Sequence, residues 1–506
     1  MISSKTSNNY YLFLITLYFI LSLIGILYHE IWLDEGHHWL LARESTSLVD
    51  LIHNTRYEGH PIIWNVLLFI ISRFTADPFW MQFLHILIST SVVVIFLRKA
   101  PFSMLFKTLF IFGYFMLFEY NLLSRNYMLG VLFIFLACSF YEYRKKRFIL
   151  FVLFLSLAAN VHAIFLIIAS GIMFIKFIEL FKFKNFKFNL IYALSWSLFI
   201  LAVAFALIQI IPPSDTTYFS RITHVPFIEK LTFGILSLFK GLITVPDFRS
   251  IHFWNSNLFI NISTPISSIF IILIYLLPLF LFNKNKVLIL YAYVSIIAAN
   301  VFFYITQLTS LRYDGMLFII IITGLWMDHY YNYEPNKINS FISQKTLDKI
   351  KKIAIYTILI IQLISGIISY TLDVVYPFDN SKNAASFLKE NNLHSKEIVS
   401  ISCEGTPLSA YLEKKIYSLC ANDYQSYCNW SSTCKINNDL EYELDNSLAN
   451  FVNSTRKEII FISNHPLYSD DQLKVKGKQF VSRLLKKFEG SILKVNDYYI
   501  YEISPN

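Results

Sequence analysis

The chain has little charge. Only 15% of its 506 residues are Asp, Glu, Lys or Arg, whereas 55% are hydrophobic and 17% are aromatic. Soluble domains usually contain about a quarter charged residues, so this composition, with a mean hydropathy of +0.50, excludes an ordinary soluble protein. It is typical of a protein that crosses a membrane many times.

Other features are also absent from the sequence. The 14 glycines form no Gly-rich phosphate loop and no dinucleotide fingerprint, and no segment is repeated. We therefore expect no nucleotide cofactor and no nucleic-acid partner. The first apolar run, residues 10–28, lacks the small-residue cleavage site of a signal peptide, which predicts a membrane helix that is retained.

Further apolar runs are separated by basic clusters. The runs fall at residues 79–97, 102–118, 128–140, 148–177, 190–211, 266–282, 287–306, 316–327 and 353–372. The clusters lie at residues 98–107, 144–147, 182–187, 284–286 and 337–352, and the positive-inside rule assigns all five to the cytoplasm. An even number of crossings must separate two clusters on one side, so the run 148–177 must turn once, at Asn160-Val161-His162. This gives an α-helical polytopic membrane protein with about eleven spans and a cytoplasmic N-terminus.

Two domains follow from this topology. Residues 1–372 are predicted as the transmembrane domain, with a large first outer loop at residues 29–78, and residues 373–506 as an extracytoplasmic domain. The tail alternates helix-like segments (383–390 and 408–414) with strand-like segments (397–403, 457–463 and 498–503), which predicts a small α/β domain.

Cysteine placement agrees with an exported tail. Cys403, Cys420, Cys428 and Cys434 all lie in it, and only Cys138 lies in a predicted span. Four cysteines in an exported segment predict two disulfides in one of three pairings. A zinc site is the alternative, although no CxxC pair is present.

The first outer loop carries groups that can do chemistry. Asp34 and Glu35 are adjacent, with no Lys or Arg beside them in the sequence, and Glu58-Gly59-His60-Pro61 precedes an apolar segment at residues 61–74. That segment is short for a span, and we expect a helix along the outer membrane surface. Paired carboxylates can take a proton from an acceptor hydroxyl or hold a divalent cation. A solvated loop is the alternative.

Arginine is preferred over lysine on the predicted outer side of the transmembrane domain. A guanidinium binds phosphate oxygens bidentately, and topology alone does not require this preference. Chance is the alternative explanation. The outer set is Arg43, Arg56, Arg73, Arg125, Arg221, Arg249 and Arg312, with only Lys230 and Lys240.

In their order along the chain, these motifs resemble the GT-C superfamily of glycosyltransferases, in particular the protein O-mannosyltransferases and lipid A aminoarabinose transferases. The resemblance extends to about residue 330, and it departs from the family at Gly36-His37-His38 and at Pro61-Ile62, where the family has two prolines. The matching motifs are Trp32-Leu33-Asp34-Glu35, Ala42-Arg43, Glu58-Gly59-His60-Pro61, Glu119-Tyr120-Asn121-Leu122-Leu123-Ser124-Arg125-Asn126-Tyr127 and Leu311-Arg312-Tyr313.

The resemblance implies a GT-C-like bundle and a glycosyltransferase that uses a polyprenyl-phosphate-linked sugar and inverts the anomeric carbon in one displacement. Its partners would be this donor, membrane lipid and an acceptor glycan, lipid or protein. A divalent cation (Mg, Mn or Zn), held by Glu35, Glu58 and His60, is left open. The implied roles are Asp34 and Glu35 as catalytic carboxylates, Glu58 and His60 as orienting groups, Arg125, Arg312 and Tyr127 as donor-phosphate ligands, and Glu119, His162 and Arg43 as further cavity residues.

Other interpretations stay open. His162 could cap a helix, and Glu119 could pair with Arg125. Trp32 and Tyr313 are interpreted as interfacial aromatics, and His37 and His38 as interfacial partners of Trp39. The whole protein could instead be a transporter or flippase for an anionic lipid or glycan, or a non-catalytic assembly subunit. We expect a bacterial inner membrane, with the endoplasmic reticulum as the alternative.

Overall fold

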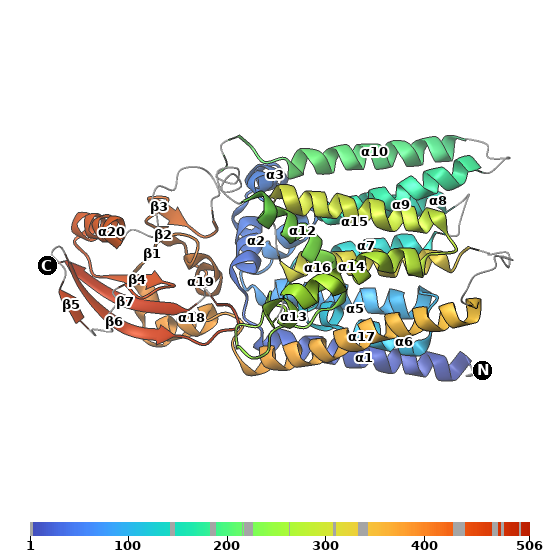
Figure 1. The fold of residues 1–506 in the computed structure, drawn as a ribbon. Helices are drawn as coiled ribbons and strands as arrows, with labels where there is room; N and C mark the ends of the chain where they lie inside the picture. Colours follow the sequence, from blue (N-terminus) through green and yellow to red (C-terminus); the bar gives the residue numbers. More distant parts are fainter. Residues whose placement is uncertain are drawn as a thin grey trace.

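The computed structural model describes residues 4–141, 147–182, 189–214, 216, 226–262, 264–306, 310–331, 343–428, 441–467, 474–476, 480–494 and 497–505. Long helices lie side by side in a bundle, and the C-terminal sheet lies at one end of it (Figure 1). The N-terminus lies at the opposite end of the bundle.

Six helices of the described residues are long and apolar enough to cross a membrane. They are Asn8–Tyr28, Phe79–Lys99, Ala163–Leu180, Leu190–Ile210, Lys286–Thr306 and Gln344–Val375. Shorter apolar helices are Ile63–Ser72, Tyr127–Ser139, Phe148–Ala159 and Phe270–Leu281. The composition and these helices together are those of a membrane protein, while the count of eleven spans stays a prediction.

The bundle is built from α-helices with two short irregular turns. The helices are α1 (Ser4–Tyr28), α2 (Leu33–Glu44), α3 (Leu48–Asn54), α4 (Ile63–Ser72), α5 (Phe79–Lys99), α6 (Met104–Ile111), α7 (Tyr127–Ser139), α8 (Phe148–Ala159), α9 (Ala163–Lys182), α10 (Leu190–Ile210), α12 (Phe227–Leu242), α13 (Leu258–Ile262), α14 (Thr264–Leu281), α15 (Lys286–Thr306), α16 (Leu311–Asp328) and α17 (Gln344–Val375). A 3-10 turn, η1 (Thr55–Tyr57), and a π-helical turn, η2 (Phe115–Glu119), complete it.

The predicted turn within residues 148–177 is confirmed. Helix α8 ends at Ala159 and α9 begins at Ala163, so Asn160-Val161-His162 connects them. The continuous span predicted at 102–118 is wrong, because α6 ends at Ile111 and η2 follows. Gly366 of α17 lies at this break, where a Cβ on Gly366 would be 2.8 Å from the backbone nitrogen of Tyr114. Close packing of α17 therefore coincides with the interruption.

Helix α12 does not correspond to any of the predicted apolar runs, because it lies between those at residues 190–211 and 266–282. It packs against α15 and α16. Lys240, which makes the segment look solvated, instead forms an ion pair of 3.2 Å with the buried carboxylate of Asp314. The positive charge of Lys240 is therefore neutralised inside the bundle.

The tail is a small α/β domain, as predicted. Its sheet has the order β3-β2-β1-β4-β7-β6-β5, with β1 parallel to β2 and β4 and the other pairs antiparallel. The strands are β1 (Glu397–Ser400), β2 (Ile416–Ser418), β3 (Asp423–Gln425), β4 (Ile459–Ser463), β5 (Lys474–Lys476), β6 (Phe480–Phe488) and β7 (Tyr498–Pro505). The helical elements are α18 (Ser381–Glu390), η3 (Leu393–Ser395), α19 (Gly405–Leu412) and α20 (Glu441–Thr455).

The tail cysteines are oxidised where the structure describes them. Cys403 is bonded to Cys428, and Cys420 is also disulfide-bonded. Cys434 lies outside the described residues. Cys138 is free and buried in α7. Disulfides, rather than a zinc site, therefore account for the described tail cysteines.

The tail is docked directly on the start of the first outer loop. The backbone nitrogen of Ile31 donates to the Tyr411 hydroxyl (2.9 Å), and the backbone nitrogen of Phe378 donates to the Glu30 carboxylate (2.8 Å). Helix α19 packs on α2, where a Cβ on Gly36 would lie 3.2 Å from the Cα of Pro407. Gly36 thus permits a close approach that a larger side chain would oppose.

Candidate functional site: a carboxylate between two guanidiniums

Asp34 is positioned by the first turn of α2. The helix begins at Leu33, and the Glu35 carboxylate accepts from the backbone nitrogen of Trp32 (3.2 Å), closing the turn as in a capping box. Acidic side chains are favoured at a helix N-terminus because its free N–H groups carry partial positive charge. Residues 33–44, which the sequence analysis placed in the first outer loop, therefore form a helix, and most of its residues are buried.

Asp34 lies between two arginines that are distant in sequence. Its Oδ2 is 3.3 Å from one terminal nitrogen of Arg125 and 3.1 Å from one of Arg312. Arg125 also donates to the backbone oxygen of Asp34 (3.0 Å). Burial acts to raise the pKa of Asp34, but the two guanidiniums outweigh it and hold that pKa below its usual value. Asp34 is thus ionised at neutral pH.

Aromatic rings surround the Arg312 guanidinium. Its central carbon lies 4.9 Å from the ring centre of Trp32, 5.1 Å from Tyr313 and 5.7 Å from Trp254. Trp32 and Tyr313, interpreted from the sequence as interfacial aromatics, are mostly buried and lie against the Arg312 guanidinium. These rings fix the guanidinium while leaving its N–H edge available to an anion.

Glu119 supports this aromatic group. It is fully buried and accepts from the indole nitrogen of Trp254 (3.0 Å) and the hydroxyl of Tyr114 (2.9 Å). It thus holds Trp254 against Arg312 instead of pairing with Arg125. The hydroxyl of Tyr120 donates to the backbone oxygen of Arg312 (2.6 Å), which fixes the start of α16.

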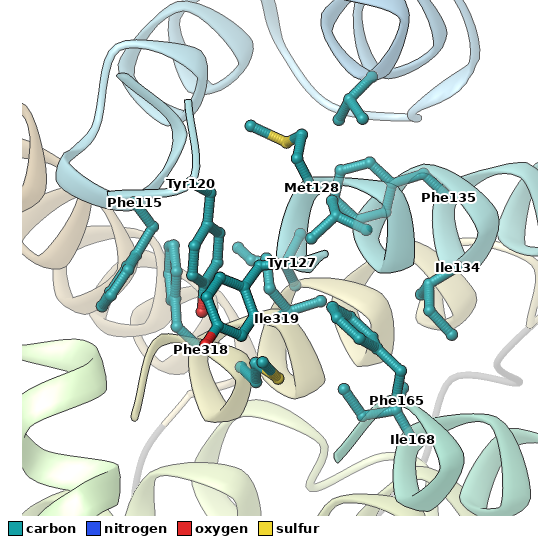
Figure 2. Close-up of a cluster of buried hydrophobic side chains, with 14 of the residues drawn as sticks. Phe115, Tyr120, Tyr127, Met128, Ile134, Phe135, Phe165, Ile168, Phe318 and Ile319 are labelled. Atoms are coloured by element: carbon teal, nitrogen blue, oxygen red, sulfur yellow. The ribbon is translucent and has the colours of Figure 1, made fainter. Parts of the chain in front are cut away.

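Tyr127, His162 and His60 form the next part of the site. The ring of His162 lies 5.6 Å from Tyr127, 5.5 Å from Tyr313 and 4.7 Å from His60. His162 does cap a helix, because its Nδ1 accepts from the backbone nitrogen of Ile164 (3.2 Å). That bond leaves Nε2 as the protonated nitrogen. Figure 2 shows Tyr127 beside Tyr120, Phe318 and Ile319. Apolar side chains therefore pack against Tyr127.

On another side of Asp34 lies a group of imidazoles with one carboxylate. His37 Nε2 is 2.7 Å from Glu58, and His38 Nδ1 is 2.7 Å from the Asn65 amide oxygen. Burial, then the charge of Arg125, lowers the pKa of His60 to about 4 and that of His38 well below its usual value. Both are neutral at physiological pH. His37 and His38 therefore belong to this buried group, whereas the sequence analysis interpreted them as interfacial partners of Trp39.

Two predicted site residues lie elsewhere. Glu35 is fully buried, and its oxygens accept from Trp32, from His29 (3.3 Å) and from the backbone nitrogen of Ser124. The hydroxyl group of an acceptor substrate cannot reach a carboxylate that is buried and hydrogen-bonded in this way. Glu35 therefore stabilises the fold around the site. Arg43 lies at the far end of α2 and binds Glu44 (3.0 Å). Nine positions along a helix place it roughly 13 Å from Asp34.

The buried polar atoms around Asp34 that have no hydrogen-bond partner among the described residues include one on each of six side chains. Natural structures leave few such atoms, and each one requires an explanation. Because these groups surround one carboxylate and include four N–H groups, they can donate hydrogen bonds to an oxygen-rich ligand. They are Trp32 Nε1, Arg125 Nε, Arg312 Nε, Tyr127 OH, His60 Nδ1 and His162 Nε2.

The metal set left open by the sequence is not assembled. Glu35 is engaged away from Glu58 and His60, and within the described part of the chain no three His, Cys, Asp or Glu side chains are grouped to hold a metal. No step of the chemistry below is therefore assigned to a metal ion.

The other outer arginines do not join the site. Arg73 donates to the backbone oxygen of Ala42 (3.1 Å), Arg249 pairs with Asp247 (2.7 Å) and Arg56 donates to Tyr57 (2.8 Å). Arg221 lies outside the described residues. Comparison of the chain with models of known families and with curated proteins finds no match.

Proposed function

We propose that the protein is a glycosyltransferase that moves a sugar from a polyprenyl-phosphate-linked donor to an acceptor hydroxyl on the extracytoplasmic side of a bacterial inner membrane. The observation that supports this most is the Asp34 carboxylate held between the guanidiniums of Arg125 and Arg312. A base and two phosphate-binding groups within a few ångströms are what the transfer requires.

The chemistry needs one base and no general acid. The acceptor oxygen attacks the anomeric carbon, its proton moves to the Asp34 carboxylate, and the bond from the anomeric carbon to the phosphate oxygen breaks. The electron pair leaves with the phosphate, which Arg125 and Arg312 neutralise. This single displacement inverts the anomeric carbon, unlike the paired acid and base of glycoside hydrolases.

Donor binding and base strength are coupled in this arrangement. The donor phosphate competes with Asp34 for the same two guanidiniums. As they turn to the phosphate, their hold on the carboxylate weakens and the pKa of Asp34 rises toward its usual value. The carboxylate thereby becomes a stronger base only when a donor is present.

The imidazole group offers a place for the acceptor. Glu58 is mostly buried, at 8% exposure of its side chain, and pairs with His37. The ring of Tyr427, from the tail, lies 5.8 Å from the ring of His37. The tail therefore contributes to the acceptor side, in keeping with a role in acceptor access.

A deletion strain tests the proposal. Cells without the protein should accumulate the lipid-linked sugar in the outer leaflet, and wild type or Asp77→Asn should restore its consumption. Asp77 is the matched control, because it caps α5 through an oxygen that asparagine retains (2.9 Å to the backbone nitrogen of Phe79). Asp34→Asn should leave the accumulation unchanged.

The same strain separates the alternatives. Accumulation of the sugar lipid in the inner leaflet would indicate a flippase instead. Full restoration by Asp34→Asn would contradict an enzymatic role and favour an assembly subunit.

A further inference from the structure

A cavity of about 400 Å³ opens at the end of the bundle opposite to the Asp34 site. It lies among the start of α6, the ends of α14 and α16 and the start of α17, on the face that the basic clusters predict to be cytoplasmic. Its volume is within the range of small-molecule sites.

Cationic side chains line this cavity. Lys351 donates to the backbone oxygen of Leu281 (2.8 Å) and to the amide oxygen of Asn283 (2.6 Å), both neutral acceptors. Its ammonium has three N–H groups, so one remains. The ammonium of Lys352 lies 5.8 Å from the ring centre of Tyr356, which is also neutral. The hydrogen-bond and ring partners of both ammonium groups are thus uncharged, while Asp348 and Asp328 act electrostatically on Lys351.

The remaining charged groups cancel only part of this pair. Lys284 and Asp348 form their own ion pair (3.4 Å). Asp328 and His329 complete the polar lining. Counting Lys284, Lys351 and Lys352 against Asp328 and Asp348, and leaving His329 out of the count, the lining carries one excess positive charge.

The rest of the lining is apolar, and the cavity borders the lipid-facing surface. Phe102, Phe106 and Ile355 form part of its wall. Just outside the cavity, Leu105 and Ile353 are exposed by 59% and 56%, as expected for side chains that face acyl chains. An ammonium pair beside an apolar wall suits a ligand that is anionic at one end and apolar at the other.

We propose that this cavity binds a phosphate ester, and that its source is the headgroup of an anionic phospholipid in the inner leaflet. Basic pockets between membrane helices on this face bind such headgroups. The proposal does not depend on the activity proposed for the Asp34 site.

Native mass spectrometry of the full-length protein with phosphatidylglycerol or phosphatidylcholine tests it. We expect wild type to prefer phosphatidylglycerol, and Lys351→Gln/Lys352→Gln to lower that affinity roughly tenfold. Lys345→Gln/Lys349→Gln is the matched control, because both lysines are exposed on the same helix and outside the cavity. Lys352→Gln alone should also lose affinity, and it removes no hydrogen bond to α14.

Glycerol phosphate distinguishes the two sources of the ligand. Displacement of the lipid by millimolar glycerol phosphate would show that the phosphate ester alone is sufficient, and resistance to displacement would show that the lipid chains contribute. Equal retention of both lipids by wild type, or an equal loss in the control double variant, would overturn the proposal.

Discussion

At the residue scale, the proposed sugar transfer depends on one carboxylate and two guanidiniums. Asp34, Arg125 and Arg312 could be chosen from the sequence because an acidic pair and outer arginines are rare in so apolar a chain. Trp254, Asn65 and Tyr427 could not be chosen, because their importance comes from the side chains they contact and not from any local pattern. Glu35 was misassigned, since adjacency in sequence does not show that a carboxylate is already fully bonded.

The pH dependence of turnover should reflect the effect of the two guanidiniums on the pKa of Asp34. In the proposed transfer, Asp34 stops acting as a base when pH falls through its folded-state pKa, which lies below the usual value. Arg312→Gln should raise that pKa, and we expect the acid limb of kcat/KM to move up by roughly one pH unit. Arg249→Gln, at an exposed arginine, is the control. An unmoved limb in Arg312→Gln would separate Asp34 from the titration.

Stability should fall in acid because of the buried neutral His60. Its folded pKa is about 4, below the unfolded value of 6.5, so the unfolded state binds more protons between these values. Stability is therefore lost progressively as pH falls from about 6.5 to 4, by an amount on the order of 3 kcal/mol for this group. Thermal melting of His60→Gln should show a shallower pH slope than wild type, and the exposed His53→Gln should not.

At the element scale, long apolar helices were predictable and irregular ones were not. The turn between α8 and α9 followed from counting crossings, whereas the break between α6 and η2 depends on backbone contact with α17, which no periodicity reveals. Helix α12 could not be predicted because it contains a lysine, Lys240, whose ion-pair partner, Asp314, is distant in sequence.

Docking of α19 on α2 should depend on Gly36. A Cβ there meets the Pro407 backbone at 3.2 Å, so Gly36→Ala requires a small shift, which the better helix propensity of Ala, by about 1 kcal/mol, offsets. Gly36→Leu cannot be accommodated in this way and should free the tail. Limited proteolysis should cut the Leu variant between the bundle and the tail much faster than the Ala variant or wild type. Equal cleavage of all three would contradict the docking.

At the scale of the whole molecule, the tail and the membrane half are in direct contact. Composition predicted both halves, but the contact between them could not be predicted, because it joins residues near 30 with residues beyond 370. Orientation remains a prediction from the basic clusters. A reporter fused after Asn506 should be extracytoplasmic and one fused after Lys187 cytoplasmic, and the reverse result would reject the topology.

Reduction should loosen the tail without preventing donor binding. The bond from Cys403 to Cys428 closes 25 residues of chain, for which loop entropy gives about 3 kcal/mol of stabilisation. Arg125 and Arg312, the arginines proposed to bind the donor phosphate, both lie in the membrane half. Mild reductant should therefore lower the melting temperature of the tail while donor affinity is kept, and freely alkylatable thiols at Cys403 and Cys428 in the oxidised protein would contradict this.

The most direct test of the central claim measures donor affinity and turnover separately in two purified variants. Asp34→Asn should lower turnover by about a hundredfold or more while donor affinity is not reduced, because it removes the base and a competitor of the phosphate. Arg125→Lys keeps the charge but loses the planar fork, so donor affinity should fall. Loss of donor binding in Asp34→Asn together with unchanged binding in Arg125→Lys would contradict the assignment of base and phosphate ligand.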